Sequence, residues 1–236
     1  MIVYGRNAVR EALRGRRSAQ VVEVWATEQA AREPWLDGLR VRRTGAAEIE
    51  ERSRSDAHQG ICAEAGGYPY VGASELLGRP DPLLLALDQV QDPQNLGALC
   101  RTAECAGVAG VVVPERRAAE VTPAVCKASA GAVEHLRVAR VRNLADFLTE
   151  AKRAGCWCYG ASARGRVAYD RPDYRGGVVL VLGGEGQGLR PRVAAGCDEL
   201  VSLPLRGRIE SLNVSAAGAI LLYEILQRKA GLDSAS

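Results

Sequence analysis

"VVLVLGGEGQGLRP", residues 178–191, joins five consecutive valine and leucine residues to a loop that contains four glycines and one glutamate. A continuous apolar run of this length that ends in glycine is typical of a strand buried on both faces, as in a parallel sheet. In open sheets of this kind, ligands bind beyond the carboxyl ends of the strands. The stretch therefore predicts both a fold class and a place for the functional site.

The glycine loop after this strand is similar to a nucleotide-binding loop, but it lacks two fingerprints. A Walker loop needs lysine after its last glycine, where Leu189 stands. A dinucleotide fingerprint spaced from Gly184 and Gly186 needs a glycine at that same position. A glycine run with Glu185 as its only carboxylate predicts close backbone approach to a ligand other than a bare pyrophosphate.

Apolar runs recur on both sides of this stretch and alternate with segments of helical pattern. The expected strands are 83–90, 110–114, 135–141, 156–162, 178–184 and 199–205, and the expected helices are 95–107, 122–131, 144–154, 189–196 and 213–229. Such alternation predicts an α/β fold with a parallel sheet and helices on both of its faces.

The chain ahead of this sheet has a separate pattern. In residues 1–66, the apolar runs "QVVEVWA" and "GICAEA" alternate with helix-like "GRNAVREALR" and "GAAEIEERSR", which indicates a small α/β domain. The glycine- and proline-rich segment "GGYPYVGASELLGRPDP" then interrupts the pattern. We therefore expect a first domain at 1–66, a linker at 67–82 and a second domain at 83–236.

Composition restricts the class of protein. The 236 residues are 47% hydrophobic and 25% charged, which is ordinary for a globular protein. The chain has no apolar run of membrane-spanning length and no visible secretory signal, so we expect a cytoplasmic protein without a membrane span. Its seven cysteines form no Cys-x-x-Cys pairs with ligand-like spacing to the two histidines. We expect reduced cysteines, mostly in the core, and no metal site.

Positive charge is concentrated near the N-terminus although the formal net charge is only +3. Residues 1–20 hold five arginines and a single acidic residue, Glu11. A second group of arginines follows at positions 40, 42, 43, 52 and 54. Such clusters fit contact with phosphates, and they equally fit solvated helix faces, so both interpretations stay open.

Two further strand ends carry polar side chains. After 83–90, Asn95 is placed to cap a helix, and Arg101 is either a solvated helix residue or a site arginine near the strand end. After 199–205, the stretch "SLPLRGRIESLNVSAAGAILLYEIL" (202–226) places four polar side chains ahead of an almost wholly apolar helix, namely Glu210, Ser211, Asn213 and Ser215. One N-cap explains one such residue, so a ligand site is the competing explanation for the rest.

Together the three strand ends resemble the three motifs of the SpoU, or TrmH-type, RNA ribose 2′-O-methyltransferases of the SPOUT class. The first motif is met by Asn95, Gly97 and Arg101. The second is met by residues 183–188, with Gly184 where many members carry alanine or another small residue, and the third by Pro204, Gly207 and residues 211–215. The stretches "YGRNAVREAL" and "HQGICAEA" also resemble the ribosomal protein L30e-like domain of the branch that methylates a guanosine of large-subunit (23S) ribosomal RNA.

This resemblance implies a SPOUT-type sheet whose C-terminal segment forms a trefoil knot, with S-adenosylmethionine as the cofactor and a homodimer built through the knotted domain. The residues that it implies for the cofactor site are Leu182, Gly183, Gly184, Leu203, Leu205 and Leu212. Those implied for catalysis are Arg101, Asn95, Glu185, Ser211 and Asn213. Those that we expect to contact RNA are Arg6, Asn7, Arg10 and Arg206.

For Arg101 the resemblance implies action on the reacting ribose. A guanidinium gives up its proton at neutral pH only at a free-energy cost of about 7 to 8 kcal/mol. We therefore expect Arg101 to stabilise the forming alkoxide and to anchor a phosphate, while a role as general base stays open. Positioning of the two reactants supplies a further part of the rate.

Several other functions stay open at this point. The same chemistry on transfer RNA, or on an antibiotic-binding site of ribosomal RNA, shares the catalytic half. A non-catalytic RNA-binding or ribosome assembly protein on this fold is a further alternative, although the presence of Asn95 and Arg101 favours an enzyme. An NAD-dependent or other α/β enzyme is also possible, although the missing dinucleotide fingerprint counts against it.

Overall fold

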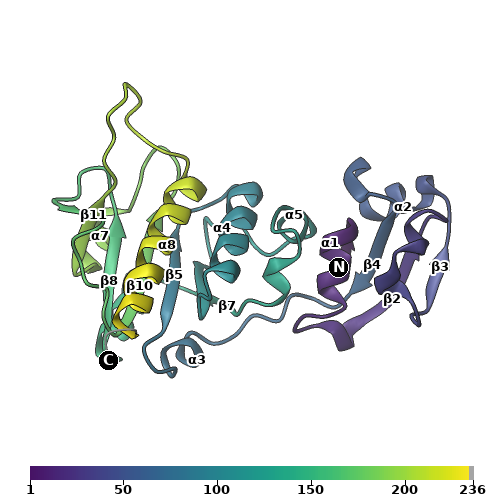
Figure 1. The fold of residues 1–236 in the computed structure, drawn as a ribbon, viewed down its shortest axis with the longest axis horizontal. Helices are drawn as coiled ribbons and strands as arrows, with labels where there is room; N and C mark the ends of the chain where they lie inside the picture. Colours follow the sequence, from purple (N-terminus) through teal and green to yellow (C-terminus); the bar gives the residue numbers. More distant parts are fainter. Residues whose placement is uncertain (234–236) are drawn as a thin grey trace. The chain divides into compact units, whose positions relative to one another are not determined.

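The computed structural model describes residues 1–233 as a mixed α/β protein (Figure 1). Its contacts divide the chain into two compact units. Unit 1 comprises Met1–Pro69 together with Glu120–His135, and unit 2 comprises Tyr70–Ala119 and the chain from Leu136 onward. The chain therefore passes from one unit to the other three times.

The sheet of unit 2 is parallel throughout. Its strands, in spatial order, are β7 (Val138–Val141), β6 (Gly110–Pro114), β5 (Leu83–Asp88), β10 (Gly177–Gly183), β8 (Cys156–Ala161), β11 (Glu199–Ser202) and β9 (Val167–Ala168). The prediction of a parallel sheet is confirmed, and all six expected strands are present within three residues of their expected ends. The two-residue strand β9 is too short for its pattern to predict it.

Helices cover both faces of this sheet. They are α3 (Ala73–Leu77), α4 (Pro93–Cys105), α6 (Leu144–Arg153), α7 (Pro191–Gly196) and α8 (Val214–Asp233). On β10, Val181 packs into the core that α3, α6 and α7 share. The next residue, Leu182, faces α8, because a Cβ added at Gly218 would lie 2.8 Å from its Cδ1. Successive strand residues point to opposite faces, so the two sets of helices lie on opposite sides.

Close packing of α4 against α8 depends on Gly218. A Cβ at this position would lie 2.5 Å from Leu99 Cδ2, so only glycine allows the two helices to approach as they do (Figure 1). Both helices begin with a side-chain cap. The carboxylate of Asp92 accepts the Gln94 N–H at 3.0 Å, and Asn213 Oδ1 accepts the Ser215 N–H at 2.8 Å. Capping thus explains one polar residue ahead of α8 and leaves the others to be explained.

Unit 1 is built on a smaller sheet of mixed direction. Its spatial order is β1 (Ile2–Tyr4), β4 (Ile61–Ala65), β2 (Val21–Ala26) and β3 (Val41–Arg43), with β2 and β3 parallel and the other neighbours antiparallel. The helices that belong to it are α1 (Arg6–Ala12), α2 (Ala46–Ser53) and α5 (Pro123–Ala128). Short 3-10 turns lie at Ser18–Gln20, Ala30–Arg32, Pro34–Leu36, Asp56–His58 and Ala132–Glu134. The predicted small α/β domain is therefore present.

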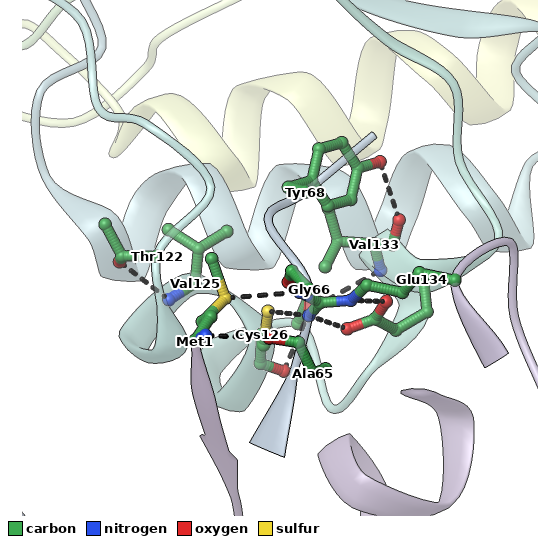
Figure 2. Close-up of polar contacts among 11 residues, drawn as sticks. Met1, Ala65, Gly66, Tyr68, Thr122, Val125, Cys126, Val133 and Glu134 are labelled. Carbon is green, nitrogen blue, oxygen red and sulfur yellow. Dashed lines mark hydrogen bonds and ion pairs between the residues drawn. The ribbon is translucent and has the colours of Figure 1, made fainter. Parts of the chain in front are cut away.

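Residues 120–135 complete unit 1 from a distant part of the sequence. The side chains of Arg17 and Glu134 are both fully buried and form two hydrogen bonds, of 2.6 and 2.7 Å. Arg17 also donates to the Gly66 carbonyl at 2.9 Å, and the Tyr68 hydroxyl donates to the Val133 carbonyl at 2.9 Å (Figure 2). Burial would lower the pKa of Arg17, but its bonds to Glu134 prevail and raise it.

The segment expected to be a linker has structure of its own. Within residues 67–82, α3 packs its Leu76 into the core of unit 2, and the Val71 N–H donates to the Val138 carbonyl at 2.9 Å. Division of function at residues 66 and 83 stays a prediction. None of the described helices has the length and hydropathy that a membrane crossing requires.

Candidate active site

Three of the predicted catalytic residues meet at one hydrogen-bonded cluster in unit 2. Asn95 Nδ2 donates to Glu185 Oε1 at 2.7 Å, and Asn213 Nδ2 donates to the same oxygen at 3.1 Å. Asn213 Nδ2 also lies 3.0 Å from Asn95 Oδ1. Asn95 belongs to α4, Glu185 to the glycine loop after β10, and Asn213 to the start of α8. The structure therefore brings together one residue from each of the three motifs.

The cluster orients a carboxylate at the edge of the sheet. Two amides hold Glu185 through one oxygen, Oε1, and charge-assisted hydrogen bonds of this kind are stronger than neutral ones. Among residues 1–233, no side chain or backbone group donates to its other oxygen, Oε2. That oxygen is free to accept a hydrogen bond from a ligand.

A cavity of about 350 Å³ opens beside this cluster. Its lining includes Asn95 and Glu185, the strand-end residues Gln89 and Gln91, and the first residue of α8, Val214. It lies beyond the ends of β5 and β10, where the sequence predicted a site. Its polar lining is formed of amides, carboxylates and backbone groups, which suit a ligand that carries hydroxyl groups and positive charge.

The glycine loop forms one wall of the cavity through its backbone. A Cβ added at Gly183 would lie 2.1 Å from the carbonyl carbon of Gly188, and one added at Gly184 would lie 2.4 Å from the Gln89 carbonyl oxygen. The Gly188 N–H donates back to the Gly184 carbonyl at 3.1 Å. Glycine is required here because the loop folds onto its own entry and onto the neighbouring strand end. The sequence predicted close approach of this backbone to a ligand. The structure shows the glycines allowing the loop backbone to approach itself and the end of β5.

Two other predicted catalytic residues lie outside this cluster. The side chain of Arg101 is exposed on α4 and makes no ion pair or hydrogen bond with any part of the chain that the structure describes. Ser211 is exposed on the loop ahead of α8, and it too has no hydrogen bond to the described residues. Their roles stay predictions.

The predicted cofactor residues fall into two groups. Gly184 lines the cavity, and Gly183 and Leu182 are the last two residues of β10. The side chain of Leu182 is buried toward α8, so only its backbone is free to serve a ligand. The second group, Leu203, Leu205 and Leu212, lies on the extended loop between β11 and α8 (Figure 1). None of the three lines the cavity.

The residues predicted to contact RNA are partly engaged with carboxylates. Arg6 pairs with Glu33 at 2.8 Å, and Arg10 pairs with Glu11 at 2.7 Å. Asn7 and Arg206 are exposed, the first on α1 and the second on the loop ahead of α8. Ion pairs at partly exposed positions are weak, so Arg6 and Arg10 remain able to exchange a carboxylate for a phosphate.

The buried cysteines are poorly suited to chemistry at this site. Burial raises the pKa of the Cys100 thiol to about 12, and burial likewise raises that of Cys158 to about 12. Such thiols stay protonated near neutral pH and are poor nucleophiles and metal ligands. Within the described residues, no three histidine, cysteine, aspartate or glutamate side chains gather as they would around a metal ion.

One buried charge near the site escaped prediction from sequence. Asp88, the last residue of β5, is fully buried and pairs with Arg190 at the end of the glycine loop. The available signal was a carboxylate that closes an otherwise apolar strand, immediately before the first motif. A buried carboxylate needs a partner, but its identity depends on a register that sequence does not give.

Comparisons with known proteins identify the family of this chain. The family model described as "SpoU rRNA Methylase family" matches residues 82–223, and the one described as "RNA 2'-O ribose methyltransferase substrate binding" matches residues 2–71. The chain is 36% identical to a putative TrmH family tRNA/rRNA methyltransferase, YacO, of Bacillus subtilis, over 96% of this chain and 95% of that protein. It is 39% identical to the 23S rRNA (guanosine-2'-O-)-methyltransferase RlmB of Xanthomonas campestris, over 94% and 90%.

Solved structures share the fold. The AdoMet-bound rRNA methyltransferase from Sinorhizobium meliloti superposes with a TM-score of 0.80 at 27% identity, over 96% of this chain and 86% of that one. The methyltransferase AviRb from Streptomyces viridochromogenes, also solved with AdoMet, superposes with a TM-score of 0.80 at 24% identity, over 98% and 90%. The latter likeness concerns the fold alone.

Proposed function

Because this chain belongs to the SpoU rRNA methylase family, we propose that it transfers a methyl group from S-adenosylmethionine to a ribose 2′-hydroxyl of structured RNA. The observation that carries the proposal is the meeting of Asn95, Glu185 and Asn213 at one cavity beyond the strand ends. Three segments far apart in sequence converge there. Capping of α8 uses only the Oδ1 of Asn213, and it leaves the Asn213 Nδ2, the Asn95 amide and the Glu185 carboxylate to be explained.

The substrate that we propose is a guanosine of 23S ribosomal RNA. Support comes from the RlmB relatives, which match along almost the whole chain, including unit 1. The YacO relative is named for both transfer and ribosomal RNA, so transfer RNA is the alternative substrate. An enzyme for ribosomal RNA works where ribosomes assemble, and we therefore place this one in the cytoplasm.

The cavity suits S-adenosylmethionine. Its backbone-rich wall at Gly184 and Gly188 offers hydrogen bonds to ribose and amino acid groups, and Glu185 offers a negative charge to a cationic sulfonium. When bound, this cofactor supplies an electrophilic methyl group. We propose that Leu203, Leu205 and Leu212 complete its site when the loop ahead of α8 closes over it as part of a trefoil knot.

The chemistry assigns a task to each polar residue. S-adenosylmethionine would supply the methyl group and leave as a neutral thioether, while the 2′-hydroxyl proton would pass by way of its hydrogen-bond acceptor to water. Glu185 Oε2 is free to accept the hydrogen bond of the 2′-hydroxyl while Asn95 and Asn213 fix its orientation. The free guanidinium of Arg101 is suited to stabilise the negative charge that develops on the oxygen. Ser211 would bind the ribose or its phosphate.

We further propose that α8 joins two copies of the chain. Leu221, Leu222 and Ile225 are buried on one side of this helix, but Ile220 and Tyr223 are 43% and 50% exposed on the other. Large apolar side chains exposed side by side are typical of an interface. An Ile220→Arg variant should sediment as a monomer, whereas Val22→Arg, at an exposed valine of unit 1, should leave a dimer intact. Equal sedimentation of both variants would contradict this interface.

Calorimetry tests the cofactor half of the proposal. The protein should bind S-adenosylmethionine with a Kd in the low micromolar range or weaker. A Kd of 1 μM corresponds to a binding free energy of about −8 kcal/mol. It should not bind NAD, because the dinucleotide fingerprint is missing. Binding of NAD without binding of S-adenosylmethionine would remove the methyltransferase proposal.

A further inference from the structure

One buried residue, Asp88, holds both ends of the glycine loop, the entry through its backbone carbonyl and the exit through its carboxylate. At the entry, the Asp88 carbonyl accepts the Gly184 N–H at 2.7 Å. At the exit, the Asp88 carboxylate accepts the backbone N–H of Arg190 at 2.8 Å and its Nε at 2.7 Å, and the second guanidinium nitrogen lies at 2.6 Å. Asp88 therefore fixes where the loop leaves the sheet and where it returns.

The pair is more than a surface ion pair. Asp88 is fully buried, whereas the Arg190 side chain is 40% exposed. A buried carboxylate without a partner is strongly unfavourable, so loss of the Arg190 contact would be costly. The buried Asp88 therefore keeps the partly exposed Arg190 side chain in one position. The fork of the guanidinium and the backbone N–H together fix the direction in which the chain leaves the loop.

The loop between these anchors has little stiffness of its own. Gly186 and Gly188 have φ of 79° and 64°, and a Cβ added at either would meet no atom within 4 Å. A glycine-rich segment loses much conformational entropy when a ligand orders it. Fixing its ends before the ligand arrives reduces that loss and raises affinity.

Asp88 also joins the first motif to the second. It pairs in register with Gly183, and the next residue, Gln89, has φ of 63° where the chain turns toward Asn95. The same residue thus sets the path toward Asn95 and the position of the loop that carries Glu185. A shift of the loop exit would move the Glu185 carboxylate away from the two amides that hold it.

We propose that Asp88 and Arg190 are a positioning pair that preorganises the glycine loop for S-adenosylmethionine; this inference rests on the proposed function, which makes that loop a cofactor site. Neither residue takes part in the chemistry. Bound cofactor orders the loop and returns Glu185 to the two amides. Loss of the pair should therefore weaken cofactor binding more than it lowers turnover at saturating cofactor.

Arg190→Ala tests the pair against a matched control. Arg192, two residues further on, pairs with Asp146 at 2.8 Å but is exposed. We expect Arg190→Ala to raise the Kd for S-adenosylmethionine by at least about tenfold while kcat changes by less than about threefold, and Arg192→Ala to change neither. Arg190→Lys should recover part of the affinity, since it restores a charge without the fork.

A double variant separates positioning from stability. In Asp88→Asn with Arg190→Met, no buried charge is left unpaired, so thermal stability should return toward that of the wild type. If the pair positions the loop, affinity stays low although stability recovers. Recovery of affinity together with stability would overturn the inference.

Hydrogen exchange without any ligand gives a readout that does not depend on the proposed function. Amides of residues 184–189 should exchange faster in the double variant than in the wild type, while those of β10 stay protected. Unchanged exchange in the loop would overturn the inference. If instead the wild type fails to bind S-adenosylmethionine but the loop still loosens in the variant, the proposed function fails and the positioning of the loop by Asp88 stands.

Discussion

The proposed chemistry depends most on Arg101, although the side chain of this residue has no partner in the part of the chain that the structure describes. It lies exposed on α4, without an ion pair to any described residue. Arg101→Ala should therefore leave stability within about 0.5 kcal/mol and S-adenosylmethionine affinity nearly unchanged, but lower kcat by orders of magnitude. Steady-state kinetics with calorimetry check both halves.

Arg101→Lys distinguishes two ways in which the arginine acts. Partial recovery of turnover would favour electrostatic stabilisation by a positive charge, and no recovery would indicate bidentate geometry. If Arg101→Ala instead lost cofactor affinity and kept its turnover at saturating cofactor, the residue would belong to the cofactor site and its catalytic assignment would be wrong.

Gly183 tests the second motif. A Cβ at this position would meet the backbone of Gly188 and Leu189, so Gly183→Ala should open the loop and abolish measurable cofactor binding. Gly45→Ala, in unit 1, is the matched control, because a Cβ there would meet nothing within 4 Å. Calorimetry on both variants checks the prediction, and wild-type affinity in Gly183→Ala would place the cofactor elsewhere.

At the scale of elements, the pattern of the sequence is a good guide to strands and helices and a poor guide to what they contact. Continuous Val/Leu runs predicted β5, β6 and β10, because such runs are typical of strands that are buried on both faces of a parallel sheet. The motifs placed Asn95, Glu185 and Asn213 at strand ends, and the structure brings them together. The Arg17–Glu134 pair was not predictable, because 117 residues separate its partners and nothing local marks either as buried.

The contribution of α5 and the following turn to unit 1 can be measured through that pair. Glu134→Gln leaves the fully buried Arg17 charge uncompensated and should lower the free energy of unfolding by about 3 to 5 kcal/mol. Asp146→Asn, which breaks an exposed pair, should cost no more than about 1 kcal/mol. Urea unfolding of both variants checks this, and equal losses would show that the buried pair does not hold residues 120–135 in unit 1.

For the whole molecule, the two units suggest a division of labour. Unit 2 contains the complete cavity, so a chain that begins at Tyr70 should bind S-adenosylmethionine with nearly unchanged affinity. It should lose methylation of the native RNA, because unit 1, matched by the substrate-binding family model, is missing. Residues 120–135 should then exchange their amides quickly, as Glu134 loses Arg17. Methylation at the wild-type rate would contradict the division.

The central claim is transfer of a methyl group to a ribose oxygen of ribosomal RNA. The most direct measurement incubates the full-length protein with methyl-labelled S-adenosylmethionine and ribosomal RNA from an unmodified strain, with transfer RNA and the Arg101→Ala variant in parallel. The RNA is then digested to nucleosides for mass spectrometry. The account predicts labelled 2′-O-methylguanosine from 23S RNA, little from transfer RNA and almost none with the variant. Label on a base, or no label in any RNA although the cofactor binds, would contradict it.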